Sequence, residues 1–494
     1  MGQMRFHLHR RDRIPPGGLP RIYVAGNEDI PWQTSSRWDG ETLVIQRGVD
    51  DSGYTYVPWV VDGHGQYLLG TSTLIERERP YLLDVELARG LIQRIRSRLF
   101  IWEWLGMKTP PELTERLQEA TRLFSRAATT QKDVASSAEA ANKAIALALT
   151  VSEQLVRAYS EQTINSRQRQ TPIASLLGVS LGPAAPTVQV KRQLVDACNI
   201  VQLPVGWRAI ESREGKRDWK PTDEQLGWCQ TAGLKVAMGP LLRLDDRGVP
   251  DWMYLWEGDD DNLVRLLLDH VKAVVSRYAG RVHLWHVASR VNNGQLLSLD
   301  EESRLNLVAQ AVQVVRKIDP RTPVVVSFDQ PWGEYLVDQE HDLAPLHYAD
   351  ALVRADLGIS GFGLEINSGY WPRGSSHRPT FEYGKLIDQW SQLGLPLMVL
   401  LTAPSGDLPD PLAAKTIAAE LVHSPDAPQQ DSQLALASSV APLLLGRTSV
   451  QVVLWNQLTD HEPHEFPHGG LFDGKGNPKP TLGMLRDLRK ACGG

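Results

Sequence analysis

Two acidic residues stand where predicted strands end, and two arginines stand near them. Asp329 and Glu365 each close a run of mostly apolar residues, while Arg290 and Arg243 follow two earlier runs. Carboxyl groups on neighbouring strands can act as an acid and base pair on one bond, or they can bind a polar ligand. The alternative is a structural network in which arginines neutralise the acids, and paired charges favour that interpretation.

Aromatic residues mark the same predicted ends. Four of the 15 tryptophans fall near strand ends or in the loops after them: Trp207, Trp332, Trp371 and Trp455. Sugar rings stack on indole rings while their hydroxyls bind Asp, Asn and Arg side chains. Packing at the rim of the fold is the alternative, so the pattern leaves both a carbohydrate or polyol ligand and simple packing open.

The segment Asp460–His468 holds three histidines and three acids. A zinc site needs its ligands to converge within about 2.0–2.2 Å of the ion, and the loose spacing here favours a solvated loop. No Gly-rich phosphate loop, Ser/His/Asp arrangement or nucleophilic cysteine motif stands out. We therefore expect no metal and no cofactor.

The bulk composition excludes several classes of partner. The 494 residues carry a formal net charge of −6, which gives no general attraction to nucleic acid or to anionic membranes. No apolar run is long enough to span a bilayer, and no apolar segment typical of a signal peptide follows the first residues. Because the three cysteines are odd in number and far apart, we expect no disulfide framework and a cytoplasmic protein.

Composition divides the chain into three parts. Residues 1–80 carry short β-type runs between Gly-containing turns, which predicts a small β-sandwich. Residues 81–170 have helical spacing and predict a helical hairpin of two helices, the second running from Pro111 to about Ser166. The polar stretch 166–170 predicts an exposed linker before the third part, residues 171–494.

In the third part, strand and helix patterns alternate. Eight strand–helix units predict an α/β fold of the (β/α)8 TIM-barrel type, although periodicity alone also allows a doubly wound sheet. In such a barrel, functional residues lie at the carboxyl ends of the strands. The expected strands begin at Leu176, Asn199, Leu234, Val282, Pro323, Ile359, Pro396 and Val450.

The segment Arg277–Arg290 resembles the fourth strand of family-ten glycoside hydrolases, the retaining endo-xylanases. It shares with them an Arg-Tyr-x-Gly turn and the positions of Trp285 and Val287. The Leu-Phe-Asp-Gly-Lys-Gly-Asn-Pro-Lys-Pro sequence of residues 471–480 resembles the family's last loop. The similarity covers most of residues 171–494 and implies a TIM barrel with a saccharide cleft. Together with the residues above, it nominates these substrate contacts: Trp207, Arg243, Arg290, Asn367, Trp371, Trp455 and Asp460.

The resemblance stops at the catalytic residues. The family's acid/base glutamate falls on Arg290 and its nucleophile on Leu401. An arginine does not release a proton near neutral pH, and a retaining glycosidase needs two carboxyl groups roughly 5–5.5 Å apart. The resemblance therefore implies the family's scaffold without its mechanism.

Three functions remain open. The first is a non-catalytic, carbohydrate-binding descendant of the family, and the second is a glycoside hydrolase with relocated acids, Asp329 and Glu365. The third is a scaffold or assembly protein that contacts partners through the sandwich and the helical hairpin. If the cleft is used, the Arg290 guanidinium predicts a neutral or acidic saccharide, and Arg243 adds a preference for uronates, unless acids already engage both arginines.

Overall fold

The computed structural model describes residues 2–26, 28–296, 299–338, 341, 343–420 and 432–493. The chain starts with two small sheets, of strand order β3-β4-β1-β7 and β2-β5-β6. Their apolar faces share one core, to which Phe6, Ile45 and Trp59 belong. The strands are β1 (Gly2–His7), β2 (Tyr23–Ala25), β3 (Thr34–Asp39), β4 (Thr42–Arg47), β5 (Gly53–Val61), β6 (Gly65–Leu74) and β7 (Tyr81–Leu82), with short 3-10 turns η1 (Arg11–Arg13) and η2 (Leu19–Arg21).

Three helices follow, where the sequence pattern predicts two. They are α1 (Leu83–Trp104), α2 (Pro111–Thr129) and α3 (Val134–Gln170), and α2 and α3 form the hairpin. The predicted second helix is interrupted because Asp133 caps a new helix, its carboxylate accepting from the Ser136 amide at 3.1 Å. Helix α1 packs closely on β6: a Cβ at Gly90 would lie 2.1 Å from the Gly70 carbonyl oxygen.

Residues from Leu176 onward form a closed parallel barrel, which confirms the predicted TIM-barrel fold. The sheet order is β10-β9-β8-β18-β16-β14-β13-β12-β11, and pairing of β10 with β12 closes the ring. The strands are β8 (Leu176–Ser180), β9 (Ile200–Leu203), β10 (Lys235–Met238), β11 (Leu242–Arg243), β12 (Leu284–Ser289), β13 (Val324–Asp329), β14 (Gly361–Asn367), β16 (Leu397–Thr402) and β18 (Val450–Trp455). Two further short strands, β15 (Tyr370–Trp371) and β17 (Ala418–Ala419), pair outside the barrel.

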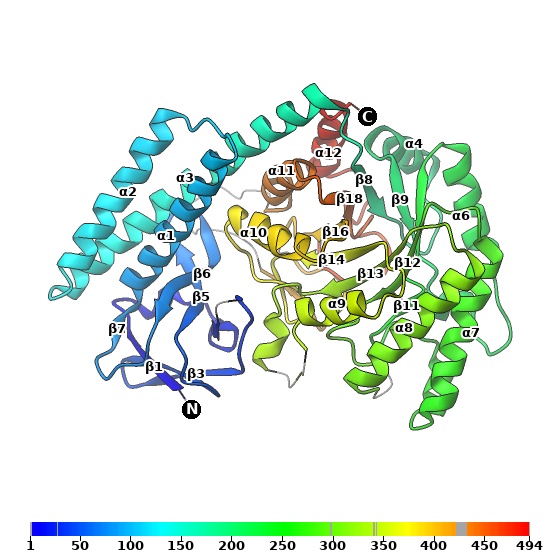
Figure 1. Ribbon diagram of the computed structural model, residues 1–494, viewed down its shortest axis with the longest axis horizontal. Helices are drawn as coiled ribbons and strands as arrows, with labels where there is room; N and C mark the ends of the chain where they lie inside the picture. The colour runs from blue at the N-terminus through cyan, green and yellow to red at the C-terminus, as the bar shows by residue number, and fades with distance from the viewer. Residues whose placement is uncertain are drawn as a thin grey trace.

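Helices surround this barrel (Figure 1), and inward-pointing side chains fill it. The interior apolar layer comprises Ile200, Ala237, Val325, Met398, Leu400, Val452 and Leu454. The helices are α4 (Val188–Ala197), α5 (Trp207–Ile210), α6 (Lys220–Thr231), α7 (Asp260–Tyr278), α8 (Glu301–Ile318), α9 (Pro345–Arg354), α10 (Thr380–Ser391), α11 (Ser432–Leu445) and α12 (Pro480–Ala491), with 3-10 turns η3 (Asp251–Trp256) and η4 (Glu334–Val337). None of the described helices combines the length and the apolar character needed to cross a membrane.

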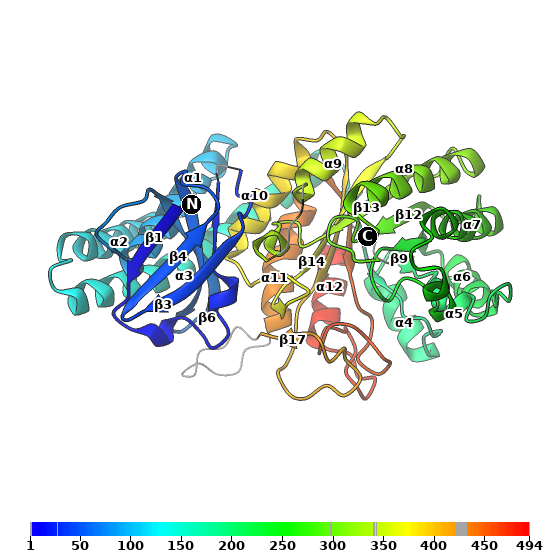
Figure 2. The same ribbon diagram turned by 90° about the horizontal axis from the view of Figure 1, so that it is seen from below.

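The N-terminal sheets lie beside the barrel, against the side that carries α10 (Figure 2). Arg98 on α1 reaches Asp388 on α10 at 2.5 Å, and Arg94 reaches Glu382 at 3.2 Å. Arg378, which is 2% exposed, donates to the Tyr23 hydroxyl at 2.7 Å. Ion pairs and buried hydrogen bonds thus hold the first part of the chain on the barrel.

Residues 166–170, which the sequence predicted to be an exposed linker, form the C-terminal end of helix α3. Helix α3 runs past α11 to the C-terminal end of the chain (Figure 1). There the Arg167 Nη1 donates to the Leu445 and Arg447 carbonyls at 2.6 and 3.2 Å. The break in composition therefore coincides with a helix end that is hydrogen-bonded to the barrel, and a folding boundary at residue 171 stays a prediction.

Replacing Arg167 with Ala should loosen this helix end. Hydrogen bonds made by a charged donor contribute about 1.5–3 kcal/mol, so local opening becomes about tenfold more frequent or more. Limited trypsinolysis followed by mass spectrometry should then show cleavage after Arg169 accelerated by about that factor. Arg157→Ala, an exposed position on the same helix, is the control and should leave the rate unchanged. Equal cleavage rates in all three proteins would contradict the anchoring role of Arg167.

Candidate functional site

Arg290 occupies the centre of the barrel mouth. It directly follows β12 and has φ of 58°, a left-handed conformation that few non-glycine residues adopt. Its side chain is only 5% exposed. Burying a guanidinium is costly unless carboxylates and hydrogen bonds compensate its charge, so the neighbours of Arg290 define this site.

Arg290 and three other charged side chains form a closed ring of ion pairs. Arg290 Nη1 contacts Asp245 at 2.8 Å and Glu465 at 2.7 Å. Arg243 Nη2 contacts the same two carboxylates, each at 2.7 Å. We call Arg243, Asp245, Arg290 and Glu465 the ion-pair ring. It joins the ends of β11 and β12 to the loop that follows β18, so it spans the mouth.

A chain of hydrogen-bonded, buried polar side chains lies between the apolar interior of the barrel and the ion-pair ring. Gln202 donates through Nε2 to the Gly239 carbonyl at 3.1 Å and faces His286 Nδ1 at 2.9 Å. His286 Nδ1 is therefore the acceptor, so Nε2 carries the proton and donates to Ser327 Oγ at 2.8 Å. Ser327 in turn donates to Glu365 Oε1 at 2.6 Å. These four inward-pointing residues form a polar layer above the apolar interior of the barrel.

The pKa values of the titratable groups in this site are shifted in different directions. Burial alone would raise the pKa of Glu465, but attraction to Arg243 and Arg290 outweighs it and lowers the pKa to about 2. The same balance holds the pKa of Asp245 well below its usual range. For Glu365, burial exceeds the opposing effect of Arg290, whose Nε lies 3.4 Å away, and the pKa is raised. Burial lowers the pKa of His286 to about 4, so this imidazole is neutral near pH 7.

Asp329 is bound by a different kind of partner. Its carboxylate accepts from Asn293 Nδ2 at 3.2 Å, Asn367 Nδ2 at 3.3 Å and the Gln330 amide at 3.0 Å. Although it is 2% exposed, it forms no ion pair with a basic side chain of the described residues. Asp329 is thus a buried carboxylate that neutral N–H donors hold in place.

Two cavities share Arg290 in their walls. The first cavity has a volume of about 360 Å³ and includes Trp207, Arg243 and Glu365 in its wall. The second cavity has a volume of about 330 Å³ and includes Asp329 and Trp371. Glu365 lines the first cavity and Asp329 the second, so the two predicted acids face different spaces although they are register partners on β14 and β13.

The predicted aromatic contacts divide into cavity walls and core. Trp207 lines the first cavity, but its ring stacks on His270 at 4.6 Å and its indole N–H donates to Glu211. Trp371 is half-buried in the wall of the second cavity. Trp455 is 2% exposed, donates to the Gly469 carbonyl at 2.8 Å, and lies outside the walls of both cavities. Trp332 packs edge-on against Tyr383 at 5.2 Å.

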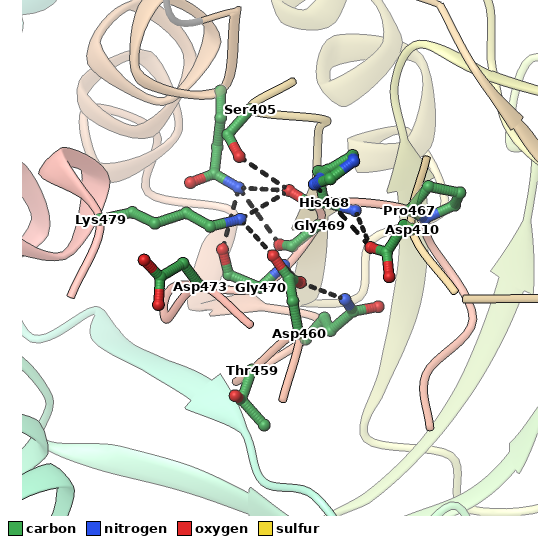
Figure 3. A network of polar contacts seen from close by, with 12 residues as sticks. Ser405, Asp410, Thr459, Asp460, Pro467, His468, Gly469, Gly470, Asp473 and Lys479 are labelled. Atoms are coloured by element: carbon green, nitrogen blue, oxygen red, sulfur yellow. Dashed lines mark hydrogen bonds and ion pairs between the residues drawn. The ribbon is translucent and has the colours of Figure 1, made fainter. Parts of the chain in front are cut away.

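The loop after β18 is packed against the barrel, in contrast to the expected solvated loop. Asp460 accepts from Lys479 Nζ at 2.5 Å and from the Gly470 amide at 2.7 Å, and Lys479 also donates to the His468 carbonyl (Figure 3). His464 Nε2 contacts Asp410 at 3.0 Å. These internal contacts fix the loop and thereby place Glu465 in the ion-pair ring.

The same loop contains a possible set of metal ligands. Among the described residues, one group of three acid or histidine ligands has its donor atoms within 4.8 Å of one another: Asp410, Asp460 and His464. Lys479 already neutralises Asp460, and His464 is hydrogen-bonded to Asp410. The donor set is therefore satisfied within the protein, and its chemistry is that of a structural clamp.

The position matched to the family's nucleophile faces away from the cleft. Leu401 belongs to the core between the barrel and its helices, whereas Leu400 lies in the interior layer and lines the first cavity. Side chains alternate along a strand, so Leu400 and Thr402 are the inward positions. Neither residue has a carboxylate. The nucleophile position of the family therefore has no acidic counterpart on β16, even when the match is shifted by one residue to an inward-pointing side chain.

Sequence reasoning missed half of the site. Asp245, Glu465, His286 and Ser327 were not among the candidates, although all four are buried at the mouth. Glu465 pairs with a residue 222 positions away, and no local pattern signals such a contact. The one available signal for His286 and Ser327 is their alternation with apolar residues on β12 and β13, which makes them inward-pointing polar groups.

Comparison with known proteins finds a distant similarity over one segment. The profile of Glycosyl hydrolase family 10 matches residues 192–321, less than half of the chain. Endo-1,4-beta-xylanase C of Paenibacillus barcinonensis is 29% identical over 89 residues, 17% of this chain and 8% of that protein. Beta-1,4-xylanase of Dictyoglomus thermophilum is 30% identical over 83 residues, 17% of this chain and 22% of that protein. The matched segments thus span less than a quarter of either relative.

Solved structures give a similar result for the barrel. Native xylanase 10B of Thermotoga maritima aligns with a TM-score of 0.49 and 15% identity, over 65% of this chain and 97% of that one. The GH10 structure from Paenibacillus barcinonensis aligns with a TM-score of 0.46 and 18% identity, over 64% and 96% of the two chains. The profile match to residues 192–321 confirms, as a distant similarity over one segment, the resemblance expected from residues 277–290.

Replacing Arg290 with Met should destabilise the protein strongly. The substitution keeps much of the side-chain volume but leaves the carboxylates of Asp245 and Glu465 buried with one cation fewer. We expect the free energy of unfolding in urea to fall by about 3–5 kcal/mol. Arg247→Met is the matched control, because Arg247 also lines the first cavity and its side chain forms no ion pair among the described residues. A loss below 1 kcal/mol for Arg290→Met would show that the ring contributes little.

Stability should decrease in two steps as the pH is lowered. His286 has a folded pKa of about 4, below its ordinary 6.5, so the unfolded chain takes up a proton first and stability falls between these values. Glu465, with a folded pKa of about 2 against 4.5, contributes stability that is lost as pH falls from 4.5 toward 2, on the order of 3 kcal/mol. Urea unfolding at closely spaced pH values measures both windows. Glu465→Gln should flatten the lower window, and an unchanged slope there would contradict the assignment.

Proposed function

We propose that this protein binds a saccharide at the barrel mouth without hydrolysing it. The observation that carries the proposal is the position of Arg290 between two cavities, with Glu365 open to one and Asp329 open to the other. Both retaining and inverting glycosidases require two carboxyl groups that flank one glycosidic bond. A bond in either cavity meets only one of these two acids.

The positions matched to the family's catalytic pair support the same conclusion. Arg290 replaces the acid/base, and it is engaged by carboxylates from three directions. On β16, Leu400 and Thr402 face inward and offer no nucleophilic carboxylate. The ion-pair ring fills the space between the two cavities with paired charges, which is a stable arrangement for a cleft that no longer carries out the reaction.

The walls of the cavities favour a polar, ring-shaped ligand. Each cavity has an indole in its wall, Trp207 in the first and Trp371 in the second, beside amide and hydroxyl groups. Volumes of 330–360 Å³ lie at the lower end of small-molecule sites. Relatives matched over part of the barrel are named endo-1,4-beta-xylanases, so xylo-oligosaccharides are the first ligands to test.

A hydrolase with relocated acids is the second candidate, and one observation favours it. The pKa of Glu365 is raised by burial, as expected of a general acid, while Asp329 forms no ion pair among the described residues. This function requires Arg290 to leave the space between them. Its three carboxylate contacts oppose that movement.

The protein should bind xylo-oligosaccharides measurably and show no turnover of xylan or of an aryl xyloside. Calorimetry measures the binding, and reducing-sugar and chromogenic assays measure turnover against a buffer blank. Trp371→Ala should weaken binding several-fold, because a stacking surface is lost, while Trp104→Ala, an exposed residue far along α1, is the control. Turnover above the blank that disappears in both Asp329→Asn and Glu365→Gln would instead favour the relocated-acid hydrolase.

A further inference from the structure

The second cavity has an excess of negative charge. Five carboxylates stand in its wall with two arginines, Arg290 and Arg373. The five acids are Asp245, Asp246, Asp329, Glu334 and Asp338. Two arginines outside the wall pair with these acids, Arg243 with Asp245 and Arg378 with Glu334. Arg290 also pairs with two acids outside the wall, Glu365 and Glu465. Seven carboxylates against four arginines leave a formal charge of −3 when all are ionised, since 4 − 7 = −3.

The arginines of this region are already paired with acids. Arg290 is engaged by three carboxylates, and Arg373 contacts Asp246 at 3.0 Å. The expected preference for uronates depended on free guanidinium groups at the mouth. With both arginines already paired, a negatively charged sugar would meet repulsion in this cavity.

Asp329 is the charge available to a ligand. It lies at the end of β13 and is only 2% exposed, and the hydrogen bonds to its carboxylate oxygens come from amide N–H groups. Asp329 interacts with the charge of Arg290 but forms no ion pair with it, so a positively charged ligand in direct contact would stabilise this carboxylate further, because the low-dielectric surroundings strengthen the attraction. Its place in the cavity wall makes that partner a ligand rather than another side chain.

Trp371 supplies a second, independent feature of the same kind. Its half-buried indole stands in the wall of this cavity. The face of an indole attracts cations as well as the apolar face of a sugar ring. Arg21 already uses this property, with its guanidinium carbon 5.9 Å from the centre of the ring. An aromatic wall and a buried carboxylate together suit a ligand that is both cationic and ring-shaped.

The spacing of the acids argues for an organic cation over a metal ion. Within the described parts of the chain, the group of three ligands with donor atoms inside 4.8 Å lies in the β18 loop and contains no residue of the second cavity. The carboxylates of this cavity are therefore too dispersed to converge on one ion. A cavity of about 330 Å³ instead has room for a sugar ring with its substituents.

We propose that the second cavity binds an amino sugar, with the protonated amine against Asp329 and the ring against Trp371. This inference rests on the proposed saccharide-binding function and assigns a ligand class to one of its two cavities. The first cavity, whose wall combines arginines and acids such as Arg243 and Glu465 with many apolar side chains, receives the neutral part of a longer oligosaccharide.

The test compares oligosaccharides that differ only in the amine. The full-length protein is titrated by calorimetry, at neutral pH and low salt, with β-1,4-linked glucosamine oligomers, with their fully N-acetylated counterparts and with neutral glucose oligomers of equal length. We expect the free-amine oligomers to bind at least about tenfold more tightly than either neutral series. Asp329→Asn should remove this preference, while Asp487→Asn, an exposed acid on α12, should keep it.

Two further measurements test the proposal even if the Asp329→Asn variant does not fold. Raising the pH through the pKa of the amine should abolish the preference in the wild type while leaving the affinity for neutral oligomers unchanged. Trp371→Ala should weaken the binding of the amine series several-fold.

The remaining outcomes separate the two proposals. Equal affinity for free-amine and neutral oligomers, or a preference that survives both deprotonation and Asp329→Asn, overturns the assignment of an amino sugar and leaves saccharide binding intact. Absence of binding to every oligosaccharide at millimolar concentration overturns both. Binding of spermidine with the same dependence on Asp329, without binding of any glucosamine oligomer, shows a site for amines and also overturns the assignment.

Discussion

The site depends on one constraint, which is the cost of burying the Arg290 guanidinium. A charge in the interior is tolerated only when opposite charges and hydrogen bonds replace the water it has lost. Asp245 and Glu465 do so here, and Arg243 completes the ring by sharing both carboxylates. Glu465 comes from the loop after β18, so the need to compensate Arg290 also dictates that this loop folds back onto the barrel. The Asp460–Lys479 pair (Figure 3) and the Asp410–His464 contact then fix the loop.

The ring also determines what the mouth can do. It divides one opening into two cavities and separates Glu365 from Asp329, which sit on adjacent strands. Hydrogen bonds link Gln202, His286, Ser327 and Glu365 in the layer beneath it, and a buried network of this kind restricts the geometry of its members. A rigid, divided mouth supports the proposal that the protein binds a saccharide without hydrolysing it.

The barrel is also supported from outside. Helix α10 receives ion pairs from α1, and Arg378 carries its charge into the interface, where it meets both Tyr23 and Glu334. Glu334 and Trp371 stand in the wall of the second cavity, so the N-terminal part reaches this wall through the Tyr23–Arg378–Glu334 contacts and through Arg21, which lies over the Trp371 ring. The N-terminal part therefore acts as a support for the wall of the second cavity as well as a separate cluster of strands. Its first sheet and the barrel share one continuous apolar core.

The sequence by itself determined the barrel, because alternating strand and helix periods are local and are repeated along the chain. It also predicted that Arg290 stands where the resembled family has its acid/base glutamate, because Arg290 follows a recognisable strand. Local pattern placed Asp329 and Glu365 at strand ends for the same reason. Only the tertiary structure decided which cavity each acid faces, which carboxylates engage Arg290, and that Trp455 lies in the core. Those outcomes depend on contacts between residues such as Arg243 and Glu465, which are 222 positions apart. They also depend on the register of β16, where a shift of one residue exchanges the cavity-facing Leu400 for the outward-facing Leu401. Electrostatic pairing in a closed barrel is set by the geometry of the ring of strands, and no local segment of the sequence contains that geometry.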